Sequence, residues 1–346
     1  MGPQPELAEP THYAGLKYGM IWTEGATNLS ALPPTGSFYC MLGPRHKGGP
    51  YSEGRAFAIV GGDLPQRLIQ SAKKKRAVDL SPVLAVGMPL TAPGTGAGQH
   101  RQVYLKVDFL YSDYHDIWHH SHLMDATAGT HLVPPAYALP PTDKPVEYKP
   151  EVRGWLQEYE RKYGKRGSST MTTEQVPLDW TCGEARVIDV TELVGSTRLR
   201  DWPVSPEITV EHIQAFEAAQ GGLHAGDVVI FHTGHVDKYL QAAPNDEDMW
   251  FNPIKGDSEG WPAPGPDTIV YLKEKGIRCV ATDAPDLGGV DPKRALMTYW
   301  AMGSHEMVGV EFLYNVGKLP EGAYFLFAAV KIRDCHGGPG RAIALY

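Results

Sequence analysis

Short apolar segments alternate with helix patterns through the second half of the chain, and this order limits the possible folds more than any other feature. Residues 227–232 and 279–283 are apolar at nearly every position, as in buried strands. Helix patterns lie around them at residues 208–216, 268–275 and 292–303. Further strands are predicted at residues 78–86, 102–109, 186–191, 310–314 and 324–331.

The first part of the chain has a different character. Residues 1–76 are rich in Gly, Pro and Tyr and contain few periodic runs, apart from a predicted helix at 64–75. We interpret this part as an extension with short strands that wraps the core or an oligomer interface. The core is predicted to span residues 77–346, with an insertion at about 140–182 that contains a helix at 155–163.

Composition excludes several classes of function. A chain of 346 residues that is 42% hydrophobic and 21% charged is expected to be globular, with a large core. The net charge of −8 argues against nucleic acid or an anionic membrane as the partner, and no apolar run is long enough to span a bilayer. The four cysteines are far apart, so neither a disulfide scaffold nor a zinc ribbon is indicated. The first residues lack a signal-peptide pattern, so we expect a cytoplasmic protein, or an exported one if a signal has been removed.

Residues 125–137 form the most distinctive motif. Gly129, Thr130, His131 and Pro135 match the frame His-x-Gly-Thr-His-x-Asp-x-Pro-x-His. This frame is typical of the metal-dependent cyclase family, whose members include bacterial kynurenine formamidase, isatin hydrolase and trans-dienelactone hydrolase. The segment therefore resembles the metal-binding motif of a hydrolase family.

Three positions of the frame carry other residues. Thr127 stands where the family has a histidine ligand, Val133 where it has an aspartate ligand, and Tyr137 where it has a catalytic histidine. The scaffold is kept while the chemistry is altered. Other residues must supply the ligands if a metal is bound.

Further blocks of the chain resemble the same family in the same order. They cover roughly residues 77–346, so the resemblance does not rest on one short motif. It implies an α/β protein with the swivelling β/β/α fold, a mixed β-sheet core and, usually, an oligomeric state. It also implies a divalent metal that activates water against an amide or lactone carbonyl. The matching blocks are residues 78–81, 226–230, 233–234, 282–286, 311–315 and 338–344.

The resemblance also suggests where ligands should lie. His131 and Glu311 match family positions, whereas the histidine expected about twelve residues before the glutamate falls near Tyr299. A hydrolytic zinc or manganese ion needs three protein ligands and an open position for water. Asp125 is the nearest substitute for the histidine lost at 127, and His235 follows a Thr-Gly pair where relatives commonly carry tryptophan.

The His-rich segment before the frame offers further metal candidates. His119 and His122 lie just upstream of His131, and His120 and His122 share one face of a strand there. Histidines on a strand are often only hydrogen-bonded, so a purely structural role is the alternative for each of them.

Each remaining candidate also has a structural alternative. Asp125 fits a turn, His131 a core histidine, and His235 a loop histidine at a strand end. Glu311 could pair with Arg341, which the family frame also keeps.

We expect catalytic roles for Tyr137, His235 and Glu311. The phenol of Tyr137 is a poor base at neutral pH but can donate a hydrogen bond to a developing oxyanion. The alternative is that Tyr137 only forms an aromatic wall of the pocket.

The sequence therefore predicts a metal-dependent hydrolase, with Zn or Mn, that opens a small cyclic ester or amide by metal-activated water. The expected partners are a small-molecule substrate and further copies of the chain, as a dimer or tetramer, with no nucleic acid and no membrane. Two alternatives stay open. One is a metal-free cyclase or isomerase, and the other is an inert binding protein that keeps only the fold.

Overall fold

A computed structural model describes residues 5–90, 104–109 and 119–346, without the side chains of residues 5–9, 109 and 119. Its centre is a sheet in the order β15-β9-β11-β13-β14-β8-β16-β4, and a further pairing of β15 with β16 closes it, apart from β4, into a barrel. The strands are β4 (Ala77–Asp79), β8 (His131–Val133), β9 (Cys182–Asp189), β11 (Val228–His232), β13 (Cys279–Thr282), β14 (Val308–Glu311), β15 (Tyr324–Ala329) and β16 (Gly338–Leu345).

The barrel is mixed in strand direction. Strands β9, β11, β13 and β14 run parallel, whereas β8, β15 and β16 pair antiparallel with their neighbours. Parallel neighbours need crossover connections, and these are supplied by the helices that follow β9, β11 and β13.

The burial of β11 explains why its sequence is apolar throughout. Ile230 points into the barrel and packs with Phe325 and Phe327, whereas Val229 and Phe231 point outward to the helices. Alternate residues of a strand face opposite sides, and here both sides are covered.

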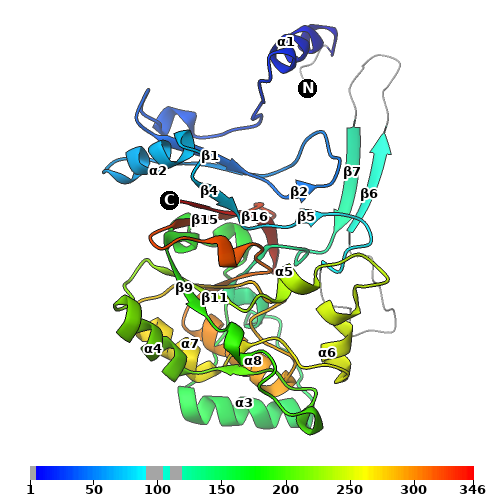
Figure 1. Cartoon of the computed structure of the whole chain (residues 1–346), viewed down its shortest axis with the longest axis vertical. Coiled ribbons are helices and arrows are strands. Elements are labelled where there is room, and N and C mark those ends of the chain that lie inside the picture. Colours follow the sequence, from blue (N-terminus) through cyan, green and yellow to red (C-terminus); the bar gives the residue numbers. More distant parts are fainter. Residues whose placement is uncertain (1–4, 91–103, 110–118) are drawn as a thin grey trace.

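Four helices cover the outer face of the parallel strands, at the lower end of Figure 1. They are α3 (Pro150–Tyr163), α4 (Val210–Gln220), α7 (Pro266–Glu274) and α8 (Pro292–Ser304). Helix α8 begins where the sequence predicts, because Asp291 Oδ1 accepts a hydrogen bond from the amide of Arg294 at 2.8 Å and Pro292 opens the first turn. Trp300 of α8 is completely buried and anchors this layer.

The N-terminal segment covers a different part of the barrel. Strands β1 (Phe38–Leu42) and β3 (Arg55–Ile59) pair antiparallel, and with α2 (Leu64–Lys73) they pack on Leu326 and Leu345. Helix α1 (Pro5–Lys17), which the sequence pattern does not predict, lies beyond these strands in Figure 1. The division into an extension and a core at residue 76 stays a prediction.

A β-hairpin stands beside the N-terminal segment (Figure 1). It consists of β6 (Tyr104–Phe109) and β7 (His119–Met124), paired antiparallel. Next to it, β2 (Arg45–His46) pairs with β5 (Val83–Leu84). One hairpin face holds the buried His120, whereas the other exposes Leu105, Val107 and Leu123, the last by 71%.

The remaining short elements connect these layers. No helix among the described residues is long and apolar enough to cross a bilayer. The short elements are β10 (Glu207–Ile208), β12 (Ala263–Pro264), α5 (His235–Tyr239), α6 (Phe251–Lys255) and 3-10 turns at Leu29–Ala31, Pro135–Tyr137, Thr173–Gln175, Leu178–Thr181, Thr191–Leu193, Leu199–Asp201, Glu247–Met249 and Val316–Lys318.

One predicted strand boundary is wrong for a local reason. The sequence predicts a strand at residues 310–314, but β14 ends at Glu311. Phe312 has a φ of 64°, a left-handed conformation that no strand can continue through. The chain turns there, directly after the glutamate of interest.

Candidate active site and histidine cluster

The frame residues of the motif hold the start of β8 in place. Gly129 has a φ of 64°, and a Cβ at this position would lie 2.6 Å from Leu84 Cδ2, so a side chain has no room. The hydroxyl of Thr130 donates to the carbonyl of Phe312 at 2.9 Å. These contacts fix the backbone that presents His131.

His131 and Glu311 meet across the β8–β14 pair, where they are register partners. His131 Nε2 and Glu311 Oε2 are 3.2 Å apart, and both residues are buried. The other ring nitrogen, Nδ1, lies 2.8 Å from the carbonyl oxygen of Gly129. A carbonyl and a carboxylate both accept hydrogen bonds, so the ring of His131 is held between two acceptors.

Two tyrosines complete this group, which we call the frame centre (His131, Glu311, Tyr299 and Tyr137). The hydroxyl of Tyr299 donates to Glu311 Oε1 at 2.6 Å, so the residue at the expected ligand position is a hydrogen-bond donor. The rings of Tyr137 and Tyr299 meet edge to face with centroids 5.2 Å apart. Partial loss of water around the hydroxyl of Tyr137 and full burial of Tyr299, followed by the charge of Glu311, raise the pKa of both phenols, so both stay protonated at neutral pH.

A carboxyl next to the frame centre titrates near neutrality. Burial, together with the charge of Glu311, raises the pKa of Asp286 to about 7. Its Oδ1 accepts hydrogen bonds from the amide of Gly289 at 2.8 Å and from Trp261 Nε1 at 3.1 Å. The frame centre therefore lies beside a carboxyl that can hold or release a proton near pH 7.

The other predicted ligands make contacts of their own. Asp125 Oδ1 accepts hydrogen bonds from the amide of Thr127 at 2.8 Å and from its hydroxyl at 2.6 Å, which is the turn arrangement. His235 is buried, its Nε2 lies 3.1 Å from the carbonyl oxygen of Met249, and burial lowers its pKa to about 4. The side chain of His119 lies outside the described part of the chain.

The expected alternative partner of Glu311 is wrong. Arg341 bonds to Asp79, with Nη2 2.6 Å from Oδ2, while Glu311 bonds to His131. Arg341 thereby ties β16 to the neighbouring β4 and leaves Glu311 to the frame centre.

His122 belongs to a second group, which we call the histidine cluster (His46, Glu53, His122 and His120). His46 Nε2 lies 3.3 Å from both carboxylate oxygens of Glu53, and His122 Nε2 lies 3.2 Å from Oε1. The rings of His46 and His122 stack with centroids 4.1 Å apart. Burial would raise the pKa of Glu53, but the hydrogen bond from His46 and the two imidazoles lower it, so the carboxylate is ionised.

Only one of these two groups brings three metal-ligand side chains together. The potential ligand atoms of His46, Glu53 and His122 all lie within 4.8 Å of one another. Among the described residues, no other set of three His, Cys, Asp or Glu side chains comes this close together. The frame centre offers only His131 and Glu311, and Tyr299 occupies one oxygen of that carboxylate. By itself the frame centre does not fit a three-ligand site.

The sequence analysis missed His46 and Glu53. Each lies in the Gly- and Pro-rich N-terminal segment, without the spacing of a known ligand motif. The contact with His122 depends on the hairpin folding onto that segment, and no local pattern reports such a contact. The available signal was a single histidine in a Gly- and Pro-rich stretch.

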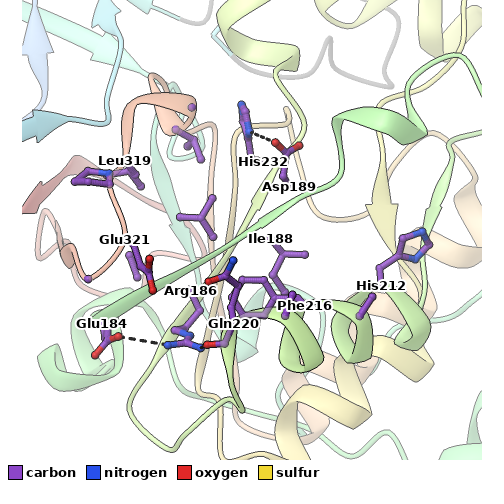
Figure 2. Close-up of a pocket in the computed structure, with 18 of the residues that line it drawn as sticks. Glu184, Arg186, Ile188, Asp189, His212, Phe216, Gln220, His232, Leu319 and Glu321 are labelled. Atoms are coloured by element: carbon purple, nitrogen blue, oxygen red, sulfur yellow. Dashed lines mark hydrogen bonds and ion pairs between the residues drawn. The ribbon is translucent and has the colours of Figure 1, made fainter.

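A hollow lies elsewhere, between β9, β11, α4 and the loop at 316–322 (Figure 2). Its volume is about 530 Å³. His232 lines it and lies 3.5 Å from Asp189 Oδ2, and Arg186 lies beside Glu184. Neither residue of the His131–Glu311 pair lines this hollow.

Comparisons with known proteins place the chain among cyclases. Residues 78–288 match the family model described as "Putative cyclase". An isatin hydrolase of Roseibium aggregatum is 31% identical over 179 residues, which are 48% of this chain and 65% of that protein. The match therefore spans slightly less than two thirds of the relative.

Solved structures show the same fold. A crystal structure of an isatin hydrolase bound to the product analogue thioisatinate matches with a TM-score of 0.61 and 20% identity, covering 83% of this chain and 99% of that chain. Isatin hydrolase A from Ralstonia solanacearum matches with a TM-score of 0.60 and 21% identity, covering 84% and 99%.

Proposed function

This chain belongs to the cyclase family, and on that premise we propose that it is a metal-dependent hydrolase that opens a small cyclic amide or ester. The observation that carries the proposal is the 31% identity to an isatin hydrolase, whose named substrate contains a cyclic amide. The frame centre supports it, because it gathers a carboxylate, an imidazole and two phenols at the family motif.

The frame centre can move the protons that ring opening requires. Water attacks the carbonyl carbon, the ring C–N or C–O bond breaks, and the leaving atom takes up a proton. Glu311 accepts the proton of the water and returns it to the leaving atom, while His131 holds that carboxylate in place. Tyr137, which is 47% exposed, reaches solvent and donates its hydroxyl to the carbonyl oxygen.

A divalent metal, when bound, lowers the pKa of a coordinated water and polarises the carbonyl. The resemblance of residues 125–137 to a metal-binding frame supports a divalent ion, and we propose Zn or Mn. Of the ligands predicted from the sequence, His131 lies in the frame centre, whereas Asp125, His235 and His122 make their contacts elsewhere. No step of the proton transfers above depends on where the ion is held.

A metal-free reaction is the second candidate. Thr127, Val133 and Tyr137 occupy family ligand or catalytic positions, and the carboxylate of Glu311 is already bonded to His131 and Tyr299. Acid and base work without metal, as in a cyclase or isomerase, fits these replacements. An inert binding protein would show neither activity.

Ring opening of isatin and of an aryl lactone tests the proposal. We expect turnover by the full-length protein, loss after chelation, and recovery with Zn or Mn. Tyr137→Phe should lower kcat about 100-fold as an oxyanion donor is lost. Tyr39→Phe, on an equally exposed tyrosine at 46%, is the matched control. Turnover that survives chelation supports the metal-free alternative, and no turnover of either compound by metal-loaded protein contradicts the proposal.

We further propose that the protein is a homo-oligomer, a dimer or tetramer. Leu105, Val107 and Leu123 expose apolar side chains on one hairpin face, which a second copy would cover. Light scattering should give a mass above that of one chain, and Leu123→Lys should reduce it. A monomeric wild-type protein at micromolar concentration contradicts this proposal.

A cytoplasmic location is the final part of the proposal. All four cysteines are free thiols in the structure, which suits a reducing compartment. Fractionation of the native host, with a cytoplasmic marker as the control, tests it.

A further inference from the structure

We propose that His46, Glu53 and His122, with His120 as a fourth ligand, form a zinc-type metal site that joins the N-terminal segment to the β6–β7 hairpin. This site lies apart from the family motif, and no residue of the frame centre contributes to it. The inference concerns metal binding and does not require the proposed hydrolase activity.

The donor set has the right chemistry for a zinc-type ion. Imidazole nitrogens with one carboxylate are ligands that Zn²⁺ accepts in tetrahedral sites. The separations of 3.2 and 3.3 Å between Glu53 and the two Nε2 atoms are close to those of ligands around one ion. The side chain of His46 is 1% exposed and that of His122 is 18% exposed, so the donors are largely shielded from water.

His120 supplies an independent observation. It is only 5% exposed, and neither of its ring nitrogens has a hydrogen-bond partner in the described structure. Buried polar atoms are rarely left unsatisfied, so a partner is expected there. The His120 ring lies 5.9 Å from that of His46 and 5.8 Å from that of His122, measured between centroids. Its ring therefore lies beside both imidazoles, on the side where a fourth ligand is needed.

The surroundings orient the ligands. His46 Nδ1 lies 2.9 Å from the hydroxyl of Tyr104, an outer contact that leaves Nε2 facing Glu53. Tyr51 bonds through its hydroxyl to the backbone of His120, at 3.1 and 3.2 Å. A Cβ at residue 49 would lie 3.0 Å from the His120 ring, so glycine allows the loop to close over the cluster.

The positive charge of Lys106, near the cluster, is compensated by Asp108. Lys106 Nζ lies 2.9 Å from Asp108 Oδ1 and bonds to the carbonyl oxygens of Lys47 and Gly48. The remaining charge at the cluster is the carboxylate of Glu53, which favours a cation. An ion there would tie β2, the loop at residue 53 and β7 together.

Metal binding to the full-length protein tests the site. After dialysis against chelator and removal of the chelator, titration with Zn²⁺ alone or Mn²⁺ alone should give about one tight Zn²⁺ per chain. His46→Ala and His122→Ala should each weaken Zn²⁺ binding at least 100-fold, and His120→Ala about tenfold. His336→Ala, on an exposed histidine outside the cluster, is the matched control and should bind like wild type.

A second readout guards against misfolded variants. In the wild type, Zn²⁺ should slow hydrogen exchange in residues 46–53 and 119–124, and Glu53→Gln should abolish that effect while keeping the side-chain shape. Unchanged Zn²⁺ binding in His46→Ala and His122→Ala overturns the proposal. Loss of Zn²⁺ in His131→Ala with retention in His122→Ala also overturns it, because it places the ion at the frame centre. Ring-opening activity is scored separately, so an inactive protein that binds Zn²⁺ at the cluster contradicts only the hydrolase proposal.

Discussion

The frame centre and the histidine cluster differ in their sequence signal and in the number of metal-ligand groups that they bring together. The frame centre lies on a distinct sequence motif, yet only two of its side chains, His131 and Glu311, are common metal ligands. The histidine cluster has no motif, yet His46, Glu53 and His122 bring three ligand atoms within 4.8 Å. A motif can therefore be kept at one place while the arrangement that suits a metal arises at another.

The contacts of the frame explain why it is kept without its ligands. Gly129 allows a left-handed turn against Leu84, and Thr130 bonds to the carbonyl of Phe312. Both are backbone requirements of the barrel, independent of metal. Thr127, one of the replaced ligand positions, serves the turn with Asp125.

The largest predicted effect concerns the buried pair of the frame centre. Glu311→Ala leaves His131, the hydroxyl of Tyr299 and the amide of Leu287 without their acceptor. We expect a loss of about 3–5 kcal/mol in the free energy of unfolding, because three buried groups lose their hydrogen-bond acceptor. Urea unfolding measures it, with Glu311→Gln as the control that keeps an acceptor. A loss below about 1 kcal/mol would mean that the pair is not buried as described.

The next effect depends on pH and concerns His235. Burial lowers the pKa of His235 to about 4 in the folded protein, from about 6.5 in the unfolded chain. The unfolded chain therefore binds the proton more readily. The stabilising contribution is present above pH 6.5 and is lost as the pH falls towards 4. Between pH 7 and pH 4 the wild type should lose about 3 kcal/mol more than His235→Gln. Unfolding at both pH values measures the difference, and equal losses would contradict the burial of a neutral His235.

A third, smaller effect tests the backbone role of the frame. Gly129→Ala should cost about 2 kcal/mol, from a left-handed φ and a contact with Leu84. Gly87→Ala is the matched control, since Gly87 has a φ of 83° but open space around a Cβ. Thermal unfolding should show a clearly smaller shift for the control. Equal shifts in the unfolding temperature of the two variants would mean that the left-handed φ alone causes the loss of stability, without a contribution from Leu84.

The smallest effect most directly separates the two regions. Asp125→Ala should lower the free energy of unfolding by only about 0.5 kcal/mol, because the two hydrogen bonds that it removes from Thr127 are exposed to solvent. Zn²⁺ content should not change, whereas His122→Ala, a few residues away, should lose the ion. Loss of Zn²⁺ in Asp125→Ala would contradict this expectation and would indicate that Asp125 is a metal ligand.

Much of the fold could be predicted because its signals are local. The apolar strands at 227–232 and 279–283 and the helix at 292–303 correspond to β11, β13 and α8. The family resemblance and the α/β fold with a mixed sheet are confirmed by the family match and the solved structures. Strand β16 and helix α1 were not predicted as elements, since neither has a clear period.

The candidate site could be predicted from the sequence only for His131 and Glu311, which lie on family motifs and meet across paired strands. The sequence by itself gave His131 and Glu311 as candidates, placed the missing family ligand near Tyr299, and indicated which family positions carry other residues. Only the tertiary structure decided that the Tyr299 hydroxyl bonds to Glu311, that Asp125 serves a turn, and that His122 faces the N-terminal segment. The physical reason is that a ligand set depends on distances between side chains from separate segments. Local periodicity reports which face a residue lies on, and it carries no information about what that face meets.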